Sequence, residues 1–320
     1  MSKQSLQINP FEYIRLSLVT LHMAKPKHDP FFSRSLEYPS IAKSFLFQHT
    51  PNHLKEYVNW KALDRVDRSN TDPKLKKLHR DMLYKASLKQ DKDIIFGIEH
   101  QSKPDSLMPI RYLRYDANIL EAYAKEGQTN WPLIINLLLY NGSKAPYPYQ
   151  GEPLGYYRHN IEGQEQLYLF FYLLDLTQIS DKQLLTHGLC APMEILLKHS
   201  FDGNFEEPIE AYKHVFNECI KEIGDDYIVS MLEYADSLKD YEIGGKMHKF
   251  VEEVFQNKQE VIMTYGQLLK REARQEGRKE GRKNEKLAIA KNMLQDGEAI
   301  EKIVRYTGLS REDIEKLKQE

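Results

Sequence analysis

The segment that most constrains the fold is residues 133–140, Leu-Ile-Ile-Asn-Leu-Leu-Leu-Tyr, which is apolar along almost its whole length. It is short and is bounded by Pro132 on one side and Asn141-Gly142 on the other, as strands commonly are. A strand that is apolar on both sides has to be covered on both faces of its sheet. The segment therefore predicts a central strand in a mixed sheet flanked by helices, which is an α/β fold.

Strands and helices of the expected types surround this segment. Residues 81–88 and 94–98 have the pattern of two strands, and the polar residues between them predict a turn, so the pair forms a hairpin. Helical spacing precedes and follows the hairpin, and a further strand leads into more helices. These other segments are a helical region at 39–60 interrupted at Pro51-Asn52, a helix at 105–124, a strand at 168–174 and a helix from Asp181.

The C-terminal part of the chain is helical in pattern but changes in character at Gly266. Residues 271–286 have an excess of basic residues, almost no large apolar residue, and a Glu-Gly-Arg-Lys unit repeated with a period of four. Glu and Arg at this spacing stabilise a solvated helix, so we expect an exposed helix or a linker. Gly277 and Gly281 leave dimerisation through this segment as a minor hypothesis.

The last segment, residues 286–320, is predicted to form short helices separated by turns, which resembles a small helix-turn-helix. Ser310, with Asp313 three residues later, predicts the start of its final helix. If this helix binds DNA, it places Arg311 and Lys316 near a groove of the DNA. Because acidic residues are interspersed on the same helix, a plain helical packing unit is at least as good an interpretation.

Composition and charge limit the classes of partner. The net charge of −2 over 320 residues means that any contact with DNA depends on local patches. No apolar run reaches the roughly 18 residues that span a bilayer, and the N-terminus lacks the features of a signal peptide. No P-loop is present. We therefore expect a cytoplasmic protein with no membrane contact and no nucleotide cofactor.

The two cysteines, Cys190 and Cys219, lie in apolar, helix-like stretches. Neither belongs to a CxxC motif or to a Cys/His spacing typical of zinc ligands. The sequence pattern thus argues against both a disulfide framework and a zinc site.

The predicted hairpin carries the residues with the clearest chemical potential. Because strand side chains alternate, Asp81 shares a face of its strand with Leu83 and Lys85. On the next strand, Glu99 and Gln101 share a face and His100 points away. Two carboxylates can therefore converge. Oxygen ligands suit Mg²⁺, so Asp81, Glu99 and the backbone carbonyl of His100 form a candidate metal site with positions left for water and phosphate.

These residues belong to a wider ordered set that resembles a known family. Asp81 followed by Glu99-x-Gln101 is similar to the hairpin of the PD-(D/E)xK nucleases. The fuller set resembles the recombination-promoting nuclease/putative transposase family, and the resemblance covers most of residues 26–320. Its other segments are His28-Asp29 with Phe32, Met82-Leu83-Tyr84, Met108 to Tyr115, Tyr140-Asn141-Gly142, Asp175 to Asp181 and the Glu-Gly-Arg tail.

The resemblance implies a restriction-endonuclease-like fold and DNA cleavage that depends on a divalent metal, Mg²⁺ first, with Mn²⁺ or Ca²⁺ as alternatives. It implies a catalytic set of Asp81, Glu99 and Gln101, DNA as the partner, and a role in recombination or mobile elements; a homo-oligomer is a further expectation. The implied divisions are an extension at 1–25, a nuclease-like core at 26–180, a helical region packed on the core at 181–265, a charged linker helix at 266–285 and a helix-turn-helix-like tail at 286–320.

One departure from the superfamily pattern concerns positive charge. PD-(D/E)xK enzymes usually carry Lys where this chain has Gln101, and an amide brings hydrogen bonds but no charge and no proton transfer near neutral pH. Electrostatic stabilisation then has to come from the metal or from another cation, for which Lys85, Lys103 and Arg111 are candidates. Asp29 is an accessory candidate as well, although an Asp before a Pro more often caps a helix.

Two other functions remain open at the sequence level. A catalytically inactive DNA-binding or interaction protein that keeps the nuclease fold is the main alternative, because the Lys is missing. A transposase with an Asp/Asp/Glu site on an RNase H-like fold is weaker, because no third acidic residue has a convincing strand context. Without the resemblance, Asp81 and Glu99 are most simply explained as solvated acids of an exposed hairpin.

Overall fold

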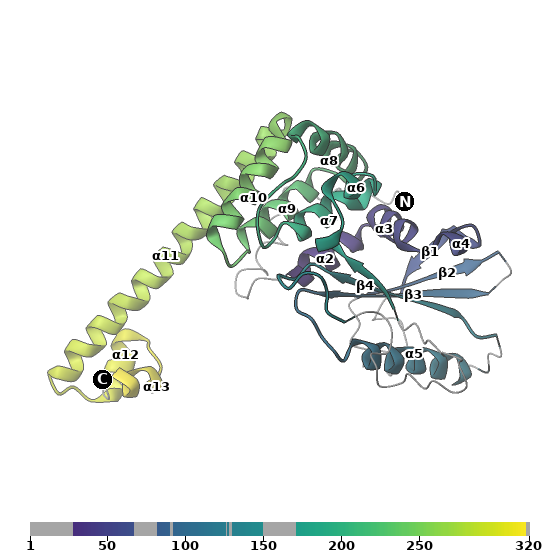
Figure 1. Ribbon diagram of the computed structural model, residues 1–320. Helices are drawn as coiled ribbons and strands as arrows, with labels where there is room; N and C mark the ends of the chain where they lie inside the picture. Colours follow the sequence, from purple (N-terminus) through teal and green to yellow (C-terminus); the bar gives the residue numbers. More distant parts are fainter. Residues whose placement is uncertain are drawn as a thin grey trace, which may run out of the picture. The chain divides into compact units, whose positions relative to one another are not determined.

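The computed structural model describes residues 28–66, 82–89, 92–125, 127, 130–149 and 171–317. The chain divides into two compact units, and the boundary lies between Lys258 and Gln259. The first unit contains a sheet with helices on both faces, and the second is wholly helical in its described part (Figure 1).

In the described residues, the sheet of the first unit has five strands, in the order in which they occur in the sequence. The first three strands pair antiparallel, and β3, β4 and β5 pair parallel. This mixed sheet, the hairpin and the central position of residues 133–140 confirm the predicted α/β class. The strands are β1 (Val58–Arg65), β2 (Met82–Leu88), β3 (Asp93–Gln101), β4 (Leu133–Tyr140) and β5 (Tyr172–Asp175).

Helix α5 (Met108–Lys125) covers one face of the sheet and connects the parallel strands β3 and β4 (Figure 1). Its buried residues recur at helical spacing, which gives the helix one apolar face. That face packs on sheet residues such as Ile95 and Leu138. Because burial of apolar area is the main source of stability, this contact fixes α5 against the ends of both strands.

Helices α2 (His28–Glu37) and α3 (Pro39–His49) lie on the opposite face, together with a layer of later helices (Figure 1). Pro39 occupies the first turn of α3, where its missing N–H costs nothing. The later elements of this layer are η2 (Leu176–Gln178), α6 (Asp181–Leu184), η3 (Gly188–Cys190), α7 (Ala191–Lys198), α8 (Ile209–Ile223), α9 (Asp226–Asp236), α10 (Tyr241–Val254) and η4 (Gln256–Lys258).

The prediction of helix through residues 39–60 is wrong at its end. The break at Pro51 is present and α4 (Asn52–Lys55) follows it, but the chain then enters β1 at Val58. Only Val58 is buried in this strand, and most of its residues are exposed. An edge strand of this kind lacks the alternating apolar pattern by which strands are recognised, so its existence depends on pairing with β2.

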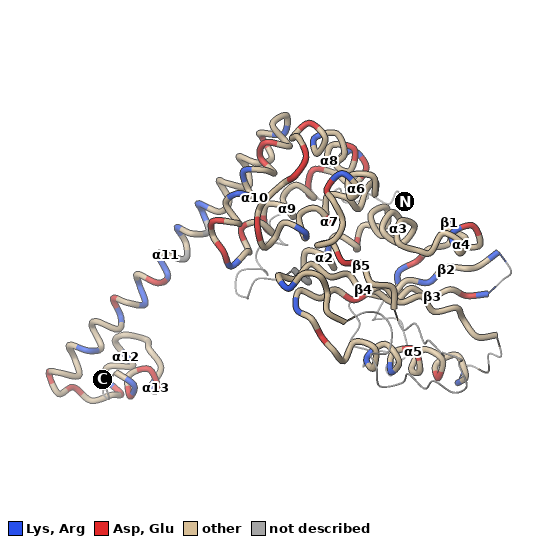
Figure 2. The backbone as a smooth tube through the Cα atoms, in the orientation of Figure 1, with Lys and Arg blue, Asp and Glu red and all other residues tan. Residues whose placement is uncertain are grey.

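The second unit begins with one long helix, α11 (Gln259–Gln295). The sequence offered a linker or an exposed helix for residues 271–286, and the helix runs through them. Basic and acidic residues both occur along it (Figure 2), as the paired-charge pattern predicts.

Two short helices complete this unit, α12 (Ile300–Thr307) and α13 (Arg311–Leu317). They pack on the end of α11 through Ala290, Ile303, Leu309 and Ile314. The hydroxyl of Ser310 accepts a hydrogen bond from the backbone N–H of Asp313 at 3.1 Å, which confirms the predicted start of the final helix.

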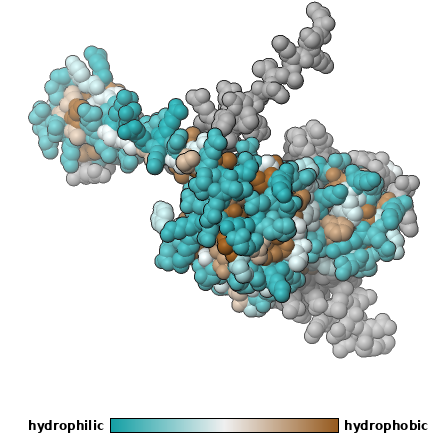
Figure 3. Space-filling view, turned by 90° about the horizontal axis from the view of Figure 1, so that it is seen from above, coloured by the Kyte–Doolittle hydropathy of each residue, from teal (hydrophilic) through white to brown (hydrophobic). Residues whose placement is uncertain are grey.

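No helix in the part of the chain that the structure describes is both long and apolar enough to cross a membrane. The face of the molecule seen in Figure 3 is mostly hydrophilic, with scattered hydrophobic areas.

Candidate active site at the end of β3

Glu99 is the chemically most unusual residue of the sheet. It lies near the carboxyl end of β3, pairs with Leu138 of β4, and its side chain is 0% exposed. Its Oε2 accepts a hydrogen bond from Nη2 of Arg111 at 2.9 Å. A buried carboxylate is costly unless it is paired or bound to a metal, so the guanidinium of α5 supplies a countercharge where the strand ends.

Arg111 is held in place by more than this ion pair. Its Nη1 donates to Oδ2 of Asp105 at 3.2 Å, and its Nε donates to the hydroxyl of Tyr115 at 3.3 Å. Burial opposes the charge of Arg111, but the carboxylate of Glu99 and the hydrogen bonds that Arg111 donates to Tyr115 and Asp105 raise its pKa above the ordinary value. The guanidinium is therefore a permanent charge, and its side chain is still 31% exposed.

Tyr115 shares this environment. Burial is the largest cause that raises the pKa of its hydroxyl, and the charge of Glu99 adds to it. The phenol thus stays protonated near neutral pH and can donate a hydrogen bond. Glu99, Arg111 and Tyr115 form one polar group between β3 and the first turns of α5.

His100 lies on the opposite face, as the alternation along the strand predicts. Its ring packs against Phe32 of α2 with the ring centroids 5.2 Å apart, and its Nε2 lies 2.9 Å from Oδ1 of Asn141. The side chain is therefore part of the core on the α2 side. The predicted metal ligand is the backbone carbonyl of His100, and its direction does not depend on where the side chain lies.

The direction of that carbonyl follows from the next residue. The carbonyl of Gln101 accepts a hydrogen bond from the N–H of Asn141, which continues β4, at 3.3 Å. Successive carbonyls of a strand point to alternate edges, so the carbonyl of His100 is directed toward the β2 edge. The backbone oxygen and the carboxylate of Glu99 are both hard oxygen donors, which suit Mg²⁺, Mn²⁺ or Ca²⁺.

The predicted partners of Glu99 are only in part visible. Asp81 lies outside the described residues; the residue after it, Met82, begins β2 and pairs with Ile98, the residue before Glu99. Gln101 ends β3 and is half-buried. It follows Glu99 by two positions and therefore shares its face of the strand.

The accessory candidates differ in where the fold places them. Arg111 contacts Glu99, whereas Lys85 pairs with Ile95, four residues and about 13 Å earlier along β3. Lys85 forms an ion pair with Asp93 at 2.6 Å instead. Lys103 is an exposed residue just after the strand. Asp29 falls in α2, but its side chain lies outside the described part of the chain.

The segment after β4 is attached to the same end of the sheet by residues that carry no catalytic signal. A Cβ on Gly142 would clash with the carbonyl oxygen of Ser102, so only glycine fits this close approach. The carboxylate of Asp175 accepts a hydrogen bond from the N–H of Tyr147 at 2.8 Å, and the hydroxyl of Tyr147 donates to the carbonyl of Asp105. These contacts fix the backbone beside Arg111.

A mixed sheet flanked by helices gives the protein an α/β, nuclease-like fold. The chain belongs to the family described as "Putative transposase, YhgA-like", which matches residues 26–226. Residues 283–319 match "Rpn/YhgA-like nuclease family, C-terminal HTH domain". The family predicted from the residues is thereby confirmed.

Related proteins include both nucleases and a protein described as inactive. The chain is 27% identical over 294 residues to recombination-promoting nuclease RpnA of Escherichia coli (strain K12), covering 90% of this chain and 95% of the relative. It is 30% identical over 174 residues to recombination-promoting nuclease RpnD of Escherichia coli O157:H7, covering 54% and 67%.

The third relative is the inactive recombination-promoting nuclease-like protein RpnE of Escherichia coli (strain K12). It is 26% identical over 292 residues, covering 90% of this chain and 96% of the relative. No solved structure matches the chain. Family membership alone therefore does not decide whether a member cuts DNA.

Proposed function

We propose that this protein is a divalent-metal-dependent DNA endonuclease that hydrolyses phosphodiester bonds in recombination or in mobile-element biology. The observation that carries the proposal is the fully buried Glu99 carboxylate, 2.9 Å from Arg111 at the carboxyl end of β3. Two of the relatives described above are nucleases by name. The family match at residues 283–319 to a helix-turn-helix domain supports DNA as the partner.

The proposed roles divide between carboxylates and a cation. Asp81, Glu99 and the carbonyl of His100 hold the metal, and Gln101 orients water or phosphate by hydrogen bonds. The bound cation supplies Lewis acidity and lowers the pKa of a water molecule. Arg111 provides the positive charge that Gln101 lacks, because its guanidinium is permanently charged and partly exposed beside Glu99.

A second function is favoured by two observations. Gln101 stands where the superfamily usually has Lys, and one full-length relative is described as inactive. Under this alternative the protein keeps the fold and binds DNA or another partner without cutting. The two functions differ in one measurable respect, which is strand cleavage in the presence of a divalent metal.

The test is cleavage of supercoiled plasmid by the full chain with Mg²⁺, Mn²⁺, Ca²⁺ or EDTA. Wild type, Asp81→Ala and Asp64→Ala are compared, because Asp64 is an exposed acid on the neighbouring strand β1 and serves as the control. We expect nicked or linear DNA from wild type and Asp64→Ala with metal, and none from Asp81→Ala or with EDTA.

Cleavage by Asp81→Ala at the wild-type rate contradicts the proposed site. Retention of DNA by wild type in a binding assay, with no cleavage under any of the metals, favours the inactive DNA-binding protein instead.

A further inference from the structure

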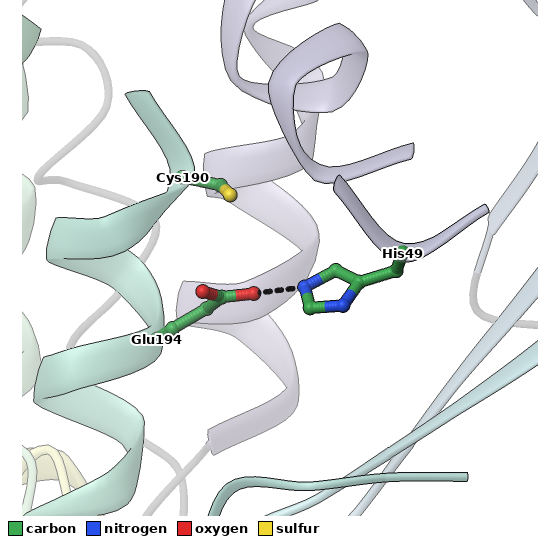
Figure 4. A group of neighbouring side chains, drawn as sticks. All are labelled: His49, Cys190 and Glu194. Atoms are coloured by element: carbon green, nitrogen blue, oxygen red, sulfur yellow. Dashed lines mark hydrogen bonds and ion pairs between the residues drawn. The ribbon is translucent and has the colours of Figure 1, made fainter. Parts of the chain in front are cut away.

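A second group of potential ligands lies in the helical layer, away from β3. His49 is the last residue of α3, Cys190 ends η3, and Glu194 lies in α7. One ligand atom from each of the three side chains lies within 4.8 Å of the other two (Figure 4). His49 and Glu194 are 145 residues apart in the sequence, so tertiary packing alone brings the group together.

All three side chains are withdrawn from solvent. The side chain of His49 is 6% exposed, that of Glu194 is 0% exposed, and Cys190 is buried. The group offers an imidazole nitrogen, a thiol sulfur and a carboxylate oxygen. This mixed N, S and O set is the one that Zn²⁺ takes, whereas Mg²⁺ and Ca²⁺ take oxygen ligands.

The carboxylate and the thiol are supported by neighbours that lie around the three candidate ligands. Oε1 of Glu194 lies 2.5 Å from Nε2 of His49, and Oε2 lies 2.6 Å from Nδ1 of His187. The carbonyl of His187 accepts hydrogen bonds from the hydroxyl of Ser44 at 2.9 Å and from the thiol of Cys190 at 3.2 Å. The contact of His187 with the carboxylate is of the kind that orients a metal ligand, whereas the thiol can donate to the carbonyl only while it keeps its proton.

We propose that His49, Cys190 and Glu194 bind one Zn²⁺ ion, and that His187 holds the second oxygen of the Glu194 carboxylate. The site joins the end of α3 to the start of α7. It uses no residue of the Glu99 group, so it is independent of the proposed nuclease activity.

Binding requires three local changes, and each can be stated from the contacts. Ligand atoms on one tetrahedral Zn²⁺ are about 3.3 Å apart at bond lengths of about 2.0–2.1 Å, so the short contact between His49 and Glu194 has to open. The Nε2 proton of His49 moves to Nδ1. The proton of the Cys190 thiol is released to solvent, which also ends the hydrogen bond of the thiol to the carbonyl of His187. Burial raises the pKa of this thiol well above its ordinary value, so the ion has to displace a proton that the buried thiol holds firmly.

The sequence pattern argued against zinc because neither cysteine belongs to a CxxC motif or to a Cys/His spacing typical of zinc ligands. The ligands predicted here come from two segments that no spacing rule connects. The local signal that remains is His187-x-x-Cys190-x-x-x-Glu194, which spans η3 and the first turn of α7 and lacks only the distant His49.

The experiment uses the full chain, purified with a non-chelating reductant and titrated with Co²⁺ as a spectroscopic substitute for Zn²⁺. We expect a thiolate-to-cobalt charge-transfer band that saturates at one equivalent and disappears on addition of Zn²⁺. The chain has two cysteines, so the same band in Cys219→Ala assigns it to Cys190. Glu194→Gln, which keeps the size of the side chain but removes its charge and replaces one acceptor oxygen with an NH₂ group, is expected to weaken Co²⁺ binding at least tenfold.

Absence of a charge-transfer band in the wild type overturns the proposal, as does a band that is lost in Cys219→Ala while circular dichroism shows that the variant is folded. Unchanged Co²⁺ affinity in Glu194→Gln overturns the assignment of that ligand. Because the readout is spectroscopic and needs no DNA, it is unaffected by whether the protein cuts.

Discussion

Two buried carboxylates, Glu99 in the sheet and Asp181 in the helical layer, have the same exposure and different surroundings. Both side chains are 0% exposed and both are paired with a cation. The Arg111 that pairs with Glu99 is 31% exposed, whereas the Lys198 that pairs with Asp181 is 10% exposed. A carboxylate whose cationic partner reaches water can exchange that partner for a metal ion, and an enclosed carboxylate cannot.

The surroundings of Asp181 are those of a structural residue. Its carboxylate accepts hydrogen bonds from Nε2 of His199 at 2.8 Å, from Nζ of Lys198 at 2.7 Å and from the hydroxyl of Tyr212. These partners come from the end of α7, the residue after it, and α8, so Asp181 ties the start of α6 to both helices. The comparison predicts that Asp181 governs stability and Glu99 governs chemistry.

The largest expected effect is on stability, in Asp181→Asn. The substitution takes the buried counterion from Lys198 and replaces one of the two acceptor oxygens with an NH₂ group, and breaking a buried ion pair costs about 3–5 kcal/mol. Urea denaturation measures the loss. Glu210→Gln is the control, because its side chain is 77% exposed and pairs with Lys213 at the surface, where a change below about 1 kcal/mol is expected.

The same contacts predict how this stability depends on pH. Burial opposes the charge of Asp181, but hydrogen bonds from His199, Lys198 and Tyr212 hold its pKa well below the usual range. A folded pKa below the unfolded value of about 3.9 stabilises the fold above that pH, and the stabilisation is lost as the pH falls further. Asp181→Asn is expected to lack this component. A variant as stable and as acid-sensitive as wild type contradicts the structural role.

A smaller loss of stability is expected from Arg111→Gln, which breaks the partly exposed ion pair between Glu99 and Arg111. We expect a loss of about 1–2 kcal/mol, less than for a fully enclosed pair, because water reaches the guanidinium. Millimolar Mg²⁺ should then raise the melting temperature of Arg111→Gln more than that of wild type, since a cation can replace the lost charge beside Glu99. Arg114→Gln, an exposed position on the same helix, is the control, and an equal effect of Mg²⁺ on all three proteins counts against a metal at Glu99.

The sequence could predict the central part of the fold because apolar runs have few alternatives. Residues 133–140 form β4 with the predicted limits, and the hairpin before it is present. The edge strand β1 was missed because only one of its residues is buried. Its place in the sheet comes from pairing with β2, which no local pattern of residues records.

The sequence could predict the strand residues of the candidate site, but not the contacts that residues from other elements make with them. Glu99 was identified from its place in the strand pattern and the resemblance, but the sequence offered Lys85, Lys103 and Arg111 equally as the missing cation. Helix α5 begins at Met108, which puts Arg111 in its first turns beside the end of β3, and only the packing of helix on sheet makes that choice. The contact between His49 and Glu194 is of the same kind.

The most direct test of Glu99 as a metal ligand at the reacting centre is plasmid cleavage by Glu99→Gln with Mg²⁺. Glu121→Gln is the matched control, because its side chain lies on α5, is 65% exposed and pairs with Lys125. We predict that Glu99→Gln, shown to be folded by circular dichroism, cuts about a hundredfold more slowly or not at all, while Glu121→Gln cuts as wild type does. A folded Glu99→Gln that cuts at the wild-type rate contradicts the claim.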